Sequence, residues 1–208
     1  HMAGAREIRT KIKSVQNTRK VTRALEMVST SKIRRAQEQM RTMRPYVRGM
    51  LGLVGHIARA NSEYKHPFMQ ERESRRIAYL VVSTDRGLCG GLNSNLFRRI
   101  LADMRGWQAK GVEVGVYAIG SKASQFFRRL NGVTFAGHAA RIGDRPTLAE
   151  LVGIVNLALD AYREGRIDRL YVATNVFVNT MTQQPTIRQL IPLVPGEDVE
   201  SRHDWDYL

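Results

Sequence analysis

The chain has 208 residues, of which 43% are hydrophobic, and a formal net charge of +14. This length can bury one core with an extended helical arm, and the composition excludes a disordered tail. Its longest apolar stretches are far shorter than the roughly 18 to 20 residues of a membrane-spanning helix, and the basic N-terminus lacks the apolar region of a secretory signal.

The N-terminal segment, residues 3–60, predicts one long helix. Its apolar residues recur at steps of three and four, the pattern of a coiled-coil seam. A single amphipathic helix cannot bury its own seam, so this segment needs a facing helix. The remaining residues, 61–208, offer no second helix of similar length. The seam consists of Ile8, Ile12, Val15, Ile33, Ala36, Met40, Met43, Val47, Met50, Val54 and Ile57.

The middle of this segment departs from the seam. Its apolar residues Val21, Leu25 and Val28 lie one place before the positions that the frame requires, and polar residues occupy those positions. Further along, Pro45 falls inside the helical pattern, and the seam continues in phase beyond it. Proline removes a backbone hydrogen bond and crowds the preceding turn, so we expect a local bend there.

Positive charge is concentrated on the same segment. Residues 3–60 carry 14 Lys and Arg against 3 Glu, a net charge of +11, whereas residues 61–208 carry only +3. A positive field on one segment indicates an anionic partner, which could be a nucleic acid, a lipid surface or an acidic protein.

Residues 61–208 alternate short apolar strands with amphipathic helices. This alternation predicts an α/β domain with a mostly parallel, Rossmann-like sheet covered by helices. Asn93 is the expected N-cap of the first helix, and Gly165 the end of the last. We expect strands at 77–83, 112–119, 133–136, 167–178 and 186–194, the last at the sheet edge, and helices at 93–110, 121–130 and 146–164.

A glycine-rich segment, Ser83–Asn93, connects the first strand to the first helix, where phosphate-binding loops occur. Its glycines match neither the dinucleotide fingerprint nor a P-loop, so a tight connection that contacts another protein is favoured. Cys89 is the only cysteine, which excludes an internal disulfide, and no His lies near it in sequence to act as a base. We expect no catalytic residue, cofactor or metal.

Six stretches resemble the gamma subunits of bacterial F-type ATP synthases, and together they extend over essentially the whole chain. The first three lie on the long helix, the fourth is the glycine-rich segment, and the last closes the chain. They are Ala3–Arg9, Ser14–Thr18, Ala24–Ser29, Ser83–Asn93, Ile119–Lys122 and Trp205–Leu208.

The resemblance implies a non-catalytic rotor. Residues 3–60 would form half of an antiparallel coiled-coil shaft, whose C-terminal helix is absent from this sequence, and residues 61–208 the α/β foot. The shaft would turn inside a hexamer of alpha and beta subunits and couple proton flow to ATP synthesis or hydrolysis. The foot would bind the epsilon subunit and the ring of c subunits. The complex would place this peripheral chain at the cytoplasmic face of the bacterial cell membrane, without a membrane contact of its own.

The same resemblance implies two regions that contact the stator. One is the off-register middle of the helix, and the other is the glycine-rich loop. The implied contact residues are Lys20, Arg23, Leu25, Glu26, Met27, Arg86, Gly87, Leu88 and Cys89.

Two other functions compete with this interpretation. A basic coiled-coil protein that binds nucleic acid would explain the charge, although the basic residues are spread along the seam and do not precede it. A nucleotide-dependent enzyme would explain the glycine-rich loop alone. Sequence-specific DNA binding would favour the first, and saturable ATP binding that depends on Gly87 or Gly90 the second.

Overall fold

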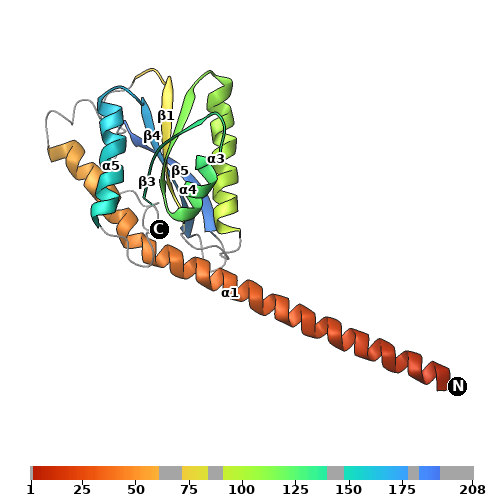
Figure 1. Ribbon diagram of the computed structural model, residues 1–208. Coiled ribbons are helices and arrows are strands. Elements are labelled where there is room, and N and C mark those ends of the chain that lie inside the picture. Colours follow the sequence, from red (N-terminus) through yellow and green to blue (C-terminus); the bar gives the residue numbers. More distant parts are fainter. Residues whose placement is uncertain (1, 61–71, 84–90, 140–147, 178–182, 193–208) are drawn as a thin grey trace.

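A computed structural model describes residues 2–60, 72–83, 91–139, 148–177 and 183–192. Its centre is one five-stranded sheet in the order β3-β2-β1-β4-β5 (Figure 1). Four strands run parallel, and β5 pairs antiparallel with β4 at one edge, which confirms the mostly parallel sheet and the edge strand. The strands are β1 Arg76–Val82, β2 Glu113–Ile119, β3 Val133–Ala139, β4 Arg169–Phe177 and β5 Gln183–Ile191.

Helices cover both faces of the sheet. On one face, α3 (Leu92–Ala109) and α4 (Ser121–Arg128) bury a cluster around Tyr79 and Phe127. On the other, α5 (Leu148–Arg163) packs over Leu80 and Val172. Because the strands are buried on both faces, their sequences are continuous apolar runs and not alternating ones. The α/β fold class is therefore confirmed.

The first helix, α1 (Met2–Ala60), is a single helix of 59 residues. At 1.5 Å per residue it is about 90 Å long, so most of it extends away from the sheet, as Figure 1 shows. The helix continues through Pro45, and Figure 1 shows it changing direction in its orange C-terminal part, before it passes beside α5. None of the helices in the described residues is long and apolar enough to cross a membrane.

Leu51 joins α1 to the sheet domain. Its side chain is only 2% exposed and belongs to the core cluster formed with α5. This contact was missed from the sequence, because Leu51 follows the seam position Met50 by one residue and so lies about 100° around the helix from it. The helix therefore uses a face beside the seam to attach to its own foot.

Two local expectations change, and a third is confirmed. The prediction that Asn93 caps α3 was wrong: Gly91 is the N-cap, and its carbonyl accepts the first helical hydrogen bond, from the backbone N–H of Asn95. The strand β3 extends to Ala139 and so is longer than expected. Gly165 does follow α5, with a φ of +77° that glycine adopts without strain.

An ionic clamp fastens the start of β1 to the turn between α5 and β4. The Arg72 guanidinium donates to the carbonyls of Tyr162 and Ile167 at 2.9 and 2.8 Å and lies 4.0 Å from the centre of the Tyr162 ring. The buried Asp168 carboxylate accepts from the backbone N–H groups of Arg75 and Arg76 at 3.0 and 3.1 Å, and lies 3.8 Å from Arg72. Segments about 90 residues apart in sequence are thus held together.

We predict that Asp168→Ala lowers the free energy of unfolding by about 2 to 4 kcal/mol, because two backbone donors lose their acceptor and the half-buried Arg72 guanidinium loses its ion-pair partner. Urea denaturation of the full chain measures this. The control is Glu73→Ala, which removes the exposed ion pair with Arg75 and should cost less than about 1 kcal/mol. Equal losses in both variants would contradict the clamp.

Candidate functional site

The N-terminal part of α1 is exposed on all sides from Gly4 to Val28. Its large apolar side chains include the seam residues Ile8, Ile12 and Val15, each more than half exposed. Exposed apolar patches of this kind mark interaction surfaces. We call residues 4–28 the arm.

The five implied contact residues of the arm do not share one face. At about 100° per residue, Lys20, Arg23 and Met27 fall within about 60° of one another. Leu25 lies on the opposite side, where it is 63% exposed, whereas Met27 is 68% exposed. Glu26 lies between the two. If these five residues make contacts, their partner has to reach opposite sides of the helix.

Two threonine hydroxyls in the middle of the arm form hydrogen bonds within the helix itself. The hydroxyls of Thr18 and Thr22 donate to the carbonyls of Ser14 and Thr18, each at 2.9 Å. Thr22 holds a seam position, and this hydrogen bond leaves its hydroxyl with no need of a partner helix. A threonine can therefore interrupt the seam at this position without leaving its hydroxyl unpaired.

The second implied contact region, Arg86, Gly87, Leu88 and Cys89, lies outside the described residues. Both ends of its loop are described. Ser83 follows β1, and its backbone N–H and hydroxyl both donate to the carbonyl of Ile119, at 2.8 and 3.3 Å. At the other end, the Asn175 side-chain amide donates to the carbonyl of Leu92 at 3.1 Å.

Gly120 is required by this arrangement. Its φ is +102°, and a Cβ atom there would lie 2.3 Å from the Ser83 carbonyl oxygen. The Ser83 hydroxyl accepts from the backbone N–H of Ala123 at 2.9 Å, which ties the loop base to the first turn of α4. The two sequence stretches that contain Ser83 and Gly120 therefore meet in space.

We predict that Gly120→Ala destabilises the fold by about 3 kcal/mol or more, because it adds left-handed backbone strain to a clash with a backbone atom. At roughly 2 to 4 °C per kcal/mol for a chain of this size, the melting temperature falls by about 6 °C or more. Circular dichroism measures the shift.

Gly106→Ala is the matched control. It lies in α3, where a Cβ meets no atom within 4 Å, so its melting temperature should stay or rise slightly. A Gly120→Ala variant as stable as this control would contradict the close approach.

The described residues contain no group of three or more His, Cys, Asp or Glu side chains placed to hold a metal ion. They do contain a pocket that the sequence did not indicate, at the edge of the sheet where the parallel strands begin. Its lining comes from β1, β2, β3, α5 and the turn after α5. No motif connects such scattered segments, so sequence patterns could not predict this pocket.

Comparison with known proteins places this chain in a family. The family model described as ATP synthase matches residues 4–208. Two ATP synthase gamma chains from Xanthomonas campestris pv. campestris, strains B100 and ATCC 33913, are each 57% identical over 208 residues, which is 100% of this chain and 72% of theirs. This chain belongs to the ATP synthase gamma chain family. A further gamma chain, from Xanthomonas axonopodis pv. citri, is 55% identical over the same share.

Solved structures similar to this gamma-family chain come from mitochondrial ATP synthases. The central stalk and c-ring of Tetrahymena thermophila gives a TM-score of 0.48 at 18% identity, over 90% of this chain and 83% of that one. The Euglena gracilis enzyme in rotational state 3 gives a TM-score of 0.41 at 14% identity, over 78% of this chain and 58% of that one. The family assignment rests on the sequence relatives.

Proposed function

We propose that this gamma-family chain is the central-stalk rotor subunit of an F-type ATP synthase and performs no bond chemistry itself. The observation that carries the proposal is the arm, a long helix whose apolar side chains Ile8, Ile12, Val15 and Leu25 are all more than half exposed. A rigid element that makes different contacts with each surrounding site can force those sites into different conformations as it turns. In this way rotation would couple proton flow to ATP synthesis or hydrolysis.

The seam of α1 would pair with an antiparallel helix that the described part of the chain does not contain. Among the described helices, α3, α4 and α5 have 18, 8 and 16 residues and pack on the sheet. Burial of a seam as long as this one requires a helix of similar length. Residues 3–60 would thus form half of the shaft and residues 61–208 the foot.

The contacts with the alpha and beta subunits would come from the middle of the arm and from the glycine-rich loop, through Lys20, Arg23, Leu25, Glu26 and Met27 and through Arg86–Cys89. The foot would bind the epsilon subunit and the c ring. These partners would hold the chain at the cytoplasmic face of the membrane. The net charge of the arm suits acidic surfaces on the stator.

Reconstitution tests the proposal. The chain, extended by the C-terminal helix that the family resemblance implies, is added to alpha and beta subunits, and ATP hydrolysis is assayed. We expect a stable, active complex from the extended chain and a weaker one from the 208 residues alone. Failure of both to bind would overturn the rotor assignment.

Charge reversal tests the contact residues. The double variant Lys20→Glu/Arg23→Glu should bind the alpha and beta subunits about tenfold more weakly at low salt, because attraction becomes repulsion. Added salt should narrow this difference by screening. The control Arg98→Glu changes an exposed residue of α3 and should bind as the unaltered chain does. A double variant that binds normally would remove these two residues from the contact.

A nucleic-acid-binding function remains the second candidate, because the arm has a strong positive charge. Titration with DNA of several sequences separates the two. Weak, strongly salt-dependent binding that ignores sequence would reflect charge alone. Sequence-specific binding that survives physiological salt would favour the alternative.

A further inference from the structure

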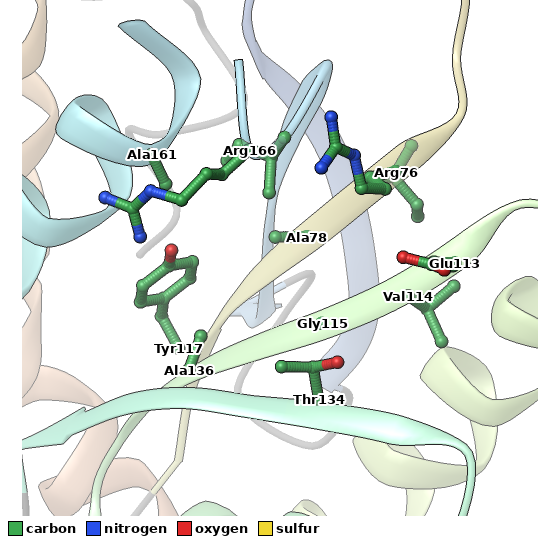
Figure 2. A pocket seen from close by; sticks show the side chains of 12 residues that line it. Arg76, Ala78, Glu113, Val114, Gly115, Tyr117, Thr134, Ala136, Ala161 and Arg166 are labelled. Carbon is green, nitrogen blue, oxygen red and sulfur yellow. The ribbon is translucent and has the colours of Figure 1, made fainter. Parts of the chain in front are cut away.

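The pocket at the start of the strands, which we call the α5–β3 pocket, has a volume of about 180 Å³ (Figure 2). Four small residues on the sheet and on α5 line it, beside larger apolar residues such as Ile77 and Val114; the four are Ala78, Gly115, Ala136 and Ala161. Gly115 lies at its centre, with Thr134 and Ala78 as its nearest neighbours across the strands. Space exists here because none of these four side chains extends beyond Cβ.

Tyr117 presents a hydroxyl to this space. The residue is only 3% exposed, and Figure 2 shows its hydroxyl directed toward Arg166 at the pocket edge. Among the described residues, no hydrogen bond involves this hydroxyl, which is open to the pocket and available to a ligand. Burial raises the pKa of Tyr117, so the hydroxyl keeps its proton and remains a donor.

Two arginines stand at the rim. Arg166 donates to the Glu164 carboxylate at 2.7 and 3.0 Å, and Arg76 donates to the carbonyl of Gly165 at 2.5 Å. A guanidinium has five N–H donors, so both retain donors for a further acceptor. Glu113, opposite Arg76 on the neighbouring strand, adds one negative charge to the rim.

We propose that the α5–β3 pocket binds a small organic monocarboxylate, with its apolar body over Gly115 and its carboxylate held by Tyr117 and Arg166. A carboxylate accepts bonds from a guanidinium and a hydroxyl together. Ligand sites for drug-sized molecules occupy roughly 300 to 1,000 Å³, so this smaller pocket suits a ligand smaller than a nucleotide. Glu113 and Glu164 further disfavour ligands with several negative charges.

The carboxylate could be carried by a free metabolite or by an acidic side chain of a neighbouring protein. Two probes distinguish these sources. The first is 4-fluorobenzoate, followed by fluorine NMR line broadening, and the second is the blocked amino acid N-acetylglutamate amide, followed by ligand-observed NMR. 4-Fluorobenzamide, which is neutral and of the same shape, is the reference for the first.

The experiment uses the full chain and two variants, each with a matched control. Gly115→Ala adds a methyl group to the pocket centre, where its nearest atoms lie at ordinary contact distances of 3.4 to 3.9 Å, so the fold should tolerate it. Its control is Gly153→Ala on α5, where a Cβ meets nothing within 4 Å. Arg166→Gln removes the rim charge, and its control Arg163→Gln removes an exposed arginine paired with Asp160.

We expect 4-fluorobenzoate to bind more tightly than the amide, and both Gly115→Ala and Arg166→Gln to weaken binding about tenfold, while both controls bind normally. If the blocked glutamate binds comparably, the source of the carboxylate is a protein side chain. If only 4-fluorobenzoate binds, the source is a free metabolite. Equal binding of acid and amide, no binding of either acid, or equal effects in variants and controls would overturn the proposal. Melting temperatures of all four variants show that each is folded.

Discussion

The constraint on which this structure depends is that one helix cannot bury its own apolar seam. The arm of α1 exposes Ile8, Ile12 and Val15 on one stripe and Leu25 on another, with no sheet face or second helix of the described chain against them. Exposed apolar area of this extent is favourable to cover, at about 25 cal/mol per Å². Burial of these side chains therefore requires a partner, because the sheet domain contacts only the C-terminal end of the helix.

The foot is built to keep that end fixed. Leu51 joins α1 to α5, and the Arg72–Asp168 clamp joins α5 and β4 to β1. From β1, Ser83 connects to Gly120 and the start of α4 at the opposite edge of the sheet. This succession of packed and hydrogen-bonded contacts links the long helix to the base of the glycine-rich loop, the two regions that we propose meet the stator. The rotor role that we propose requires torque to pass between these regions, and such continuity would serve that need.

Periodicity predicted most of the fold. Continuous apolar runs such as residues 77–83 predicted buried strands, and steps of three and four predicted the long helix, because these patterns record burial directly. Periodicity could not predict contacts between segments that are distant in the sequence. Leu51 lies beside the seam and looks like any other apolar residue of the helix, and the Arg72–Asp168 clamp joins residues whose proximity only the folded sheet creates. The contact residues of the arm came from resemblance to a family. The α5–β3 pocket arises from small side chains on five segments, which carry no local pattern.

Hydrogen exchange of the arm tests the central claim most directly, since a lone helix without tertiary packing is marginal in water. The amides of residues 4–28 would be followed in the isolated chain and in the reconstituted complex, with those of β1 as the internal reference. Fast exchange of the arm in the isolated chain, and protection approaching that of β1 in the complex, is the result that the account predicts. An arm as strongly protected as β1 in the isolated, monomeric chain would contradict it.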